Sequence, residues 1–98
     1  MNEPAVASAK PYGILHMPTA GKAIDHASVA AQLKLNKVIQ DLSTNPRPDE
    51  RESADQYGEG YSTILVRKTS PAYVITYRID DAEYRVVIIA VSEARWKQ

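Results

Sequence analysis

Three apolar segments of strand length dominate the second half of this chain, at residues 61–68, 72–79 and 84–91. They are rich in Val, Ile, Thr and Tyr, the residues that suit a pleated and half-buried surface. Only three residues separate the first two segments, and four separate the last two. Because such short polar gaps favour hairpins over crossover connections, the pattern predicts a three-stranded antiparallel meander.

The apolar positions between residues 29 and 42 recur with the period of an α-helix. They lie along one stripe, which comprises Ala31, Leu35, Val38, Ile39 and Leu42. A helix with Ser28 as its N-cap is therefore expected to bury that stripe. A shorter helix is expected over residues 20–26, with Thr19 as its cap, and a short edge strand over 12–17, between two prolines.

The remaining segments are polar. Residues 1–11 are small, polar and interrupted by prolines, so we expect a flexible N-terminal tail followed by one domain over 12–98. Residues 44–60 contain only Ala54 and Tyr57 as apolar side chains, which predicts a long loop that is either functional or simply solvated. The predicted order is strand, two helices, loop and three strands, an α+β domain with its helices on one face of the sheet.

The last predicted strand is apolar on both faces. Simple alternation directs its side chains to two sides, with Tyr84, Val86, Ile88 and Ala90 on one and Arg85, Val87, Ile89 and Val91 on the other. This pattern is typical of a central strand that is covered on both sides. Since the predicted helices cover a single face, we expect the tail, a second copy or a partner protein to close the other.

Composition narrows the function classes. The 98 residues contain no cysteine, which excludes disulfides and thiolate metal sites. Nothing pairs His16 or His26 with a carboxylate cluster, so neither a metal nor a cofactor is expected. The longest apolar run, 86–91, is too short to span a bilayer, and a cytoplasmic protein without membrane contact is expected.

The net charge is zero, but the charges are unevenly distributed. Residues 41–60 carry six acidic and two basic side chains, while 61–98 carry six basic and four acidic.

Two short motifs resemble a known family. One is Asn45-Pro46-Arg47, which follows a helix ending in Asp41-Leu42, and the other is Tyr77-Arg78-Ile79-Asp80-Asp81 before the last hairpin. Together with the order of elements, they resemble the RelE/ParE superfamily of bacterial type II toxins over residues 12–95. The resemblance implies the same fold and a cognate antitoxin that wraps the toxin and covers its apolar sheet.

The resemblance also implies an activity and a set of residues. Some members of the superfamily are ribosome-dependent mRNA endonucleases, others poison DNA gyrase, and some have no detectable activity. RNA cleavage through the ribose 2′-OH needs a group that accepts its proton, cations that hold the phosphate and a donor to the leaving oxygen. The catalytic residues implied are Arg67, Arg78, Arg95 and, as general base, Glu93. The RNA-binding residues implied are Lys68, Tyr73, Arg85 and Lys97.

This chain departs from the mRNA-cleaving branch at several positions. Thr63 and Leu65 stand where that branch tends to have lysines, and Glu93 and Ala94 stand where a basic pair is typical. Three hypotheses remain: an mRNA endoribonuclease with an incomplete catalytic set, a ParE-like inhibitor that binds gyrase, and an inactive module that only binds its antitoxin. The expected partners are accordingly the antitoxin and either the ribosome with mRNA or gyrase. Such arginines, and a glutamate at a strand end, more often only solvate a sheet surface and have no catalytic role.

Overall fold

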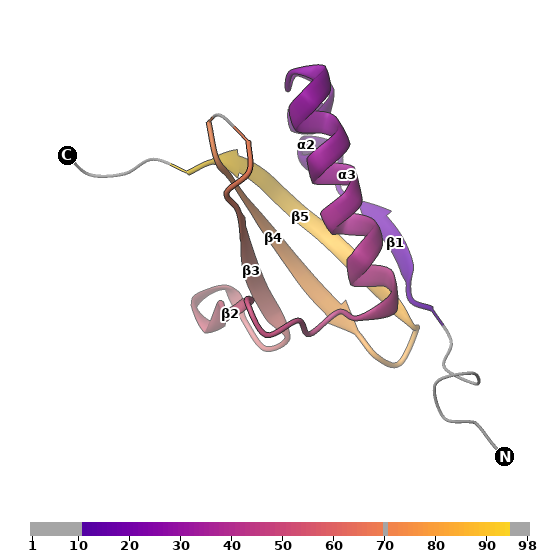
Figure 1. Ribbon diagram of the computed structural model, residues 1–98. Helices are drawn as coiled ribbons and strands as arrows, with labels where there is room; N and C mark the ends of the chain where they lie inside the picture. The colour runs from indigo at the N-terminus through magenta and orange to yellow at the C-terminus, as the bar shows by residue number, and fades with distance from the viewer. Residues whose placement is uncertain (1–10, 70, 95–98) are drawn as a thin grey trace, which may run out of the picture.

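Backbone hydrogen bonds join five strands into one curved sheet in this computed structural model, which describes residues 11–69 and 71–94 (Figure 1). The elements in chain order are β1 (Gly13–His16), α2 (Pro18–Asp25), α3 (Val29–Thr44), β2 (Glu52–Ser53), η1 (Asp55–Tyr57), β3 (Tyr61–Val66), β4 (Tyr73–Asp80) and β5 (Arg85–Glu93). The strand order is β1-β5-β4-β3-β2, with β1 parallel to β5 and all other neighbours antiparallel. The α+β class, the edge position of β1 and the β3–β4–β5 meander are confirmed, within a mixed sheet of five strands.

The segment predicted as a long loop contains one of these strands. β2 pairs with β3, so that Glu52 lies opposite Thr63 and Ser53 opposite Ser62, and the 3-10 turn η1 follows it. Both residues of β2 are exposed. Their pairing depends on the backbone of β3 rather than on apolar side chains, which is why the hydrophobic pattern did not predict this strand.

Both predicted helices form, but only one has the predicted cap. Ser28 Oγ accepts the Ala31 N–H at 3.2 Å and caps α3 as expected. α2 begins at Pro18 with Met17 as its N-cap, so the prediction that Thr19 caps it was wrong. Pro18 suits the first helical position because its fixed φ is helical and its missing N–H would have no acceptor there. Neither described helix is long and apolar enough to cross a membrane.

One hydrophobic core lies between the two helices and one face of the sheet. Four residues of the predicted stripe on α3 are buried in this core, namely Ala31, Leu35, Ile39 and Leu42. Val38, the fifth residue of the stripe, is only partly buried. Ala20 and Ile24 of α2 join the same cluster. In Figure 1, α3 crosses in front of the sheet and partly hides α2. The periodicity of residues 29–42 therefore identified the largest helical contribution to the core.

A bulge in β5 changes which of its residues face this core. The register shifts between Thr76 and Tyr77 of β4, which leaves Ile89 of β5 without an opposite residue in β4. Because an extra residue reverses the alternation along a strand, Val91 joins Ile88 in the core. The simple alternation predicted for β5 was therefore wrong beyond Ile88.

The sheet face away from α3 is less apolar than the sequence predicted. Val87 is only 5% exposed and lies in register between Leu15 and Arg78. Thr63 and Thr76 share the rest of this face with the partly exposed Leu65 and Val74. The large exposed hydrophobic side chains among the described residues are Leu15, Met17, Val29, Leu33, Tyr57 and Tyr84. The open face is thus mixed rather than uniformly apolar, and the two most exposed apolar side chains, Val29 and Leu33, belong to α3.

Candidate functional site

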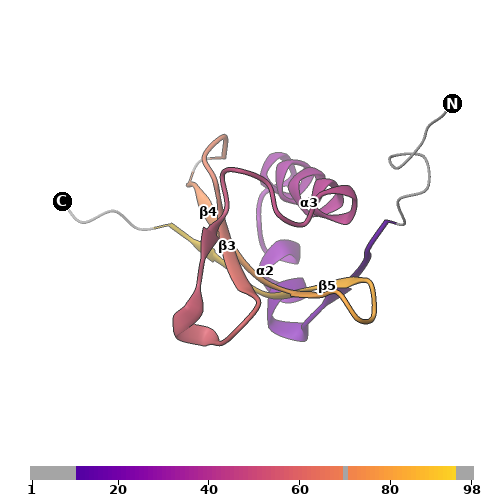
Figure 2. The ribbon, with the colours of Figure 1, turned by 90° about the horizontal axis from the view of Figure 1, so that it is seen from below.

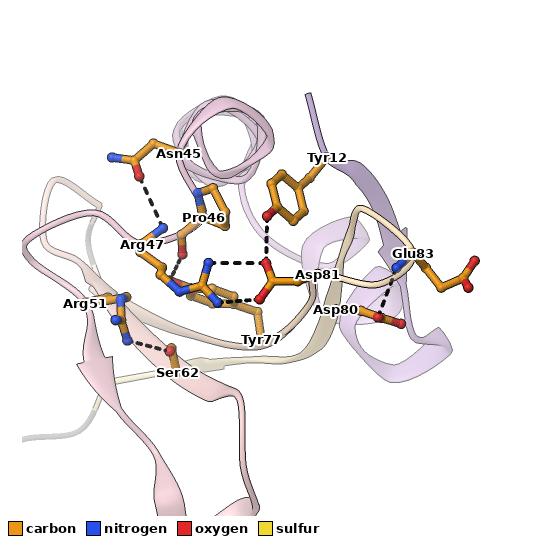
Figure 3. A network of polar contacts seen from close by, with 10 residues as sticks. All are labelled: Tyr12, Asn45, Pro46, Arg47, Arg51, Ser62, Tyr77, Asp80, Asp81 and Glu83. Carbon is orange, nitrogen blue, oxygen red and sulfur yellow. Dashed lines mark hydrogen bonds and ion pairs between the residues drawn. The ribbon is translucent and has the colours of Figure 1, made fainter. Parts of the chain in front are cut away.

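The two motifs that carry the family resemblance meet in one polar cluster (Figure 3). The Arg47 guanidinium donates to both carboxylate oxygens of Asp81, at 2.8 and 3.3 Å, and Tyr12 Oη donates to the same carboxylate at 2.6 Å. Tyr77 Oη donates to the buried Pro46 carbonyl at 2.9 Å. The cluster ties the segment before β1, the end of α3 and the β4–β5 hairpin together. The residues of the two motifs therefore stabilise the fold.

The hydrogen bonds from Arg47 and Tyr12 lower the pKa of Asp81 below its ordinary value of 3.8. Because the pKa of Asp81 is lower in the folded chain than in the unfolded chain, its ionised carboxylate stabilises the fold at pH values above the ordinary pKa. This stabilisation is lost as the pH falls through the folded-state pKa. We expect Asp81→Asn to be less stable than the wild type at pH 7 and to lose less stability than the wild type between pH 6 and pH 3, measured by urea unfolding. Glu83→Gln, which removes a carboxylate from the same hairpin without touching Arg47, is the control. Equal pH dependence in wild type and Asp81→Asn would contradict the assignment.

Removing the Tyr77 hydroxyl tests the other half of the cluster. Tyr77→Phe leaves the buried Pro46 carbonyl without its donor, and a buried unsatisfied polar group costs about 1–3 kcal/mol. We expect a decrease of that size in the free energy of unfolding, measured with urea. Tyr57→Phe removes a hydroxyl from an exposed ring and should change the same quantity by less than about 0.5 kcal/mol. Equal effects of the two substitutions would show that the Tyr77 bond does not hold the segment.

Residues 45–60 form an ordered wall beside the sheet. Arg51 Nη1 donates to the buried Ser62 Oγ at 3.0 Å, and the Ala54 N–H donates to the Tyr61 carbonyl at 3.0 Å. Figure 2 shows the segment around η1 below β3, on the side away from α3. The wall therefore borders the sheet face that the helices leave open.

A cavity of about 660 Å³ lies against this wall, and we call it the open-face cavity. Its floor consists of side chains from β3 and β4, namely Thr63, Leu65, Val74 and Thr76. The wall contributes Glu50, Glu52 and Tyr57, and the end of β5 contributes Glu93. Carboxylates and hydroxyls therefore gather at one depression on the open face.

The structure brings two of the four expected catalytic residues together. Arg67, which follows β3, and Glu93, which ends β5, both line the open-face cavity. Tyr77 is buried in the core, so alternation directs the neighbouring Arg78 to the open face, but Arg78 does not line the cavity. Arg95 lies outside the described residues.

The expected RNA-binding residues are dispersed. Lys68 borders a different depression, and Arg85 pairs with Asp80 at 3.6 Å beside the β4–β5 hairpin. Tyr73 is buried in the core, which corrects the expectation that it binds RNA. Lys97 lies outside the described residues. Among residues 11–69 and 71–94, no group of three or more His, Asp or Glu residues could hold a metal ion.

The second depression, about 780 Å³, separates α3 from β3, and we call it the α3–β3 groove. Its apolar lining includes Leu33 and Val38 of α3 and Ile64 of β3. Leu33 is 69% exposed. Four basic side chains and one acidic side chain surround this lining: Lys34, Lys37, Arg67, Lys68 and Glu50. The groove thus combines an apolar floor with a basic rim.

Sequence reasoning missed the residues that give the two depressions their character. Glu50 and Glu52 belong to a polar segment, and no spacing rule places them opposite Arg67. Leu33 lies off the buried stripe of α3, as does Val29. A large apolar residue on the polar side of a helix was the available signal for a contact surface.

Comparison with solved structures shows a RelE-like fold. The isolated E. coli RelE toxin superposes with a TM-score of 0.76 at 20% sequence identity, over 89% of this chain and 88% of that one. The toxin–antitoxin complex RelBE2 from Mycobacterium tuberculosis matches with a TM-score of 0.71 at 22% identity, over 89% and 95%. An archaeal RelE–RelB complex from Pyrococcus horikoshii matches with a TM-score of 0.61 at 14% identity, over 85% and 94%.

No protein-family model matches the sequence, and no curated protein sequence matches it. The likeness therefore concerns the fold, which the polar cluster of residues 45–47 and 77–81 helps to hold. The residues of the two depressions must be judged by their own chemistry.

Proposed function

We propose that this chain is the toxin component of a type II toxin–antitoxin pair and that its cognate antitoxin covers the α3–β3 groove. The fold likeness supports the first part, since the similar solved structures include RelE toxins in complex with their RelB antitoxins. The observation that carries the second part is the groove itself. An apolar depression with exposed Leu33 and a basic rim suits an amphipathic partner segment with acidic flanks.

The pairing is tested with the protein encoded by the neighbouring reading frame. We expect the two chains to purify as a stable complex after co-expression and the partner to relieve any growth arrest that this chain causes alone. High ionic strength should weaken the complex, because lysines at the groove rim contribute to it. If the two purified chains remain separate at micromolar concentrations, the pairing is excluded.

Cleavage of mRNA on the ribosome is supported by the shared position of Arg67 and Glu93 in the open-face cavity. In that mechanism the Glu93 carboxylate accepts the proton of the ribose 2′-OH. The 2′ oxygen then attacks phosphorus, the bond to the 5′ oxygen breaks, and the leaving oxygen takes up a proton. Arg67 would hold the phosphate charge.

Mapping mRNA ends after induction tests this version. Wild type should produce cuts that Arg67→Ala and Glu93→Gln reduce at least tenfold, while Glu83→Gln, at the β4–β5 hairpin, retains them. Unchanged mRNA ends and unchanged protein synthesis would exclude it.

The charge of the open-face cavity favours the alternative in which the chain acts by binding a protein. The described lining carries three carboxylates against one guanidinium, and carboxylates repel RNA phosphates. A gyrase inhibitor would induce a DNA-damage response while translation continues. A module that only binds its antitoxin would cause neither effect.

A further inference from the structure

We propose that the open-face cavity is a docking site for a lysine- and arginine-rich segment of a partner protein other than the antitoxin. This goes beyond the proposed pairing, which concerns the neighbouring α3–β3 groove; Glu50, Leu65 and Arg67 line both depressions. It rests on the charge of the cavity, on an aromatic ring presented at its wall and on the contrast with the groove.

The charge of the cavity selects a cation. Glu50 and Glu52 of the wall and Glu93 of β5 face the same depression as Arg67, which gives the described lining a net charge of −2. The floor is neutral, with hydroxyl and aliphatic side chains from β3 and β4. A basic peptide gains attraction from such a surface, whereas a nucleic-acid backbone is repelled by it.

Tyr57 adds an aromatic face to this wall. Its side chain is 59% exposed although it lines the cavity. The backbone holds it in place, because the Tyr57 N–H donates to the carbonyl of the buried Ala54 at 2.9 Å. Its ring contacts that of Tyr61, with centroids 6.2 Å apart.

The turn after Tyr57 requires glycine. Gly58 has a φ of +129°, and a Cβ at this position would lie 3.2 Å from the Tyr61 ring. The turn therefore sets the backbone position from which the Tyr57 side chain reaches the cavity. A depression lined by a tyrosine ring and by carboxylates can bind guanidinium and ammonium groups through cation–π contact and ion pairing.

The α3–β3 groove has the opposite character. Its floor is apolar, and besides Arg67 and Glu50, which line both depressions, its rim carries Lys34, Lys37 and Lys68, whereas the cavity adds Glu52 and Glu93. One binding segment does not suit both surfaces, since an acidic amphipathic segment fits the groove and a basic, extended one fits the cavity. The two depressions are therefore assigned to two partners of opposite charge.

Fluorescence anisotropy with the full chain tests this assignment. The probe is a labelled nine-residue peptide of alternating arginine and glycine, compared with the same peptide carrying glutamate for arginine and with a labelled uridine oligonucleotide. We expect saturable binding of the arginine peptide that weakens with salt, and at least tenfold weaker binding of the other two probes. Preferential binding of the oligonucleotide, or no binding of the arginine peptide, overturns the proposal.

Variants locate the binding. Glu52→Gln and Tyr57→Ala should each weaken the arginine peptide threefold or more, while Tyr57→Phe, which keeps the ring, and Glu83→Gln, at the far hairpin, bind as the wild type does. Thermal unfolding of each variant confirms that it is folded. Equal affinities throughout would place the peptide elsewhere. Binding only by a chain that ends at Ala94 would instead assign the cavity to residues 95–98, and this too overturns the proposal.

Discussion

Replacing Leu35 by alanine is expected to lower the free energy of unfolding by about 2–5 kcal/mol, the range for truncation of a fully buried leucine. Leu35 is 0% exposed and lies where α3 packs on the sheet. A domain of this size is stable by only about 5–15 kcal/mol, so the variant should lose a large share of its stability. Urea unfolding followed by far-UV circular dichroism measures the change.

The matched control lies two residues away on the same helix. Leu33 loses the same atoms in Leu33→Ala, but it is 69% exposed, so we expect a change within about 0.5 kcal/mol. Both substitutions replace leucine by alanine, a better helix former, in the middle of α3. Any difference between them therefore reports the burial of the side chain and not the residue type. If both variants lost similar stability, the assigned face of α3 would be wrong.

Replacing Leu33 by glutamate is expected to weaken antitoxin binding at least thirtyfold while the chain remains folded. The substitution puts a charge on the apolar floor of the α3–β3 groove, and burial of an unpaired charge under a partner is costly. Truncation at such central contacts commonly costs about 2 kcal/mol or more. Isothermal titration with the purified partner gives the change in Kd.

Val29→Glu is the control for that measurement. Val29 is also exposed and apolar on α3, but it does not line the groove. It stands in the first turn of the helix, where an acidic side chain is favourable, so the variant should remain folded. Val29→Glu is expected to keep the affinity within threefold of the wild type. Loss of binding in both variants would show a contact with α3 that is not confined to the groove.

The elements that sequence reasoning identified are those with repeating apolar patterns. The stripe from Ala31 to Leu42 gave α3, and the alternating Val, Ile and Tyr residues gave β3, β4 and β5. The sequence pattern did not predict β2, because its two polar residues pair with β3 through backbone hydrogen bonds and not through apolar side chains. The bulge at Ile89 was not predicted either. The segment is apolar throughout, so its composition does not show that the extra residue moves the side chains after Ile89 to the opposite face of the sheet.

The site was less predictable than the fold. The motifs at residues 45–47 and 77–81 were correct signals of the fold, and their side chains turn out to hold the scaffold through Arg47, Asp81 and Tyr77. Arg67 and Glu93 were identified by resemblance and share a cavity. Glu50 and Glu52 of the wall were not identified from the sequence. Their positions depend on the path of residues 45–60, which is set by contacts between distant parts of the chain, such as that of Tyr77 with Pro46.

Hydrogen–deuterium exchange of the chain, alone and in complex with the protein of the neighbouring reading frame, tests the central claim most directly. A partner seated in the α3–β3 groove should slow amide exchange in residues 29–38 and 64–68. Exchange should change little at the β4–β5 hairpin around Asp81. Protection restricted to other surfaces, such as β1, or no protection at saturating partner, would contradict the groove as the place where the antitoxin binds.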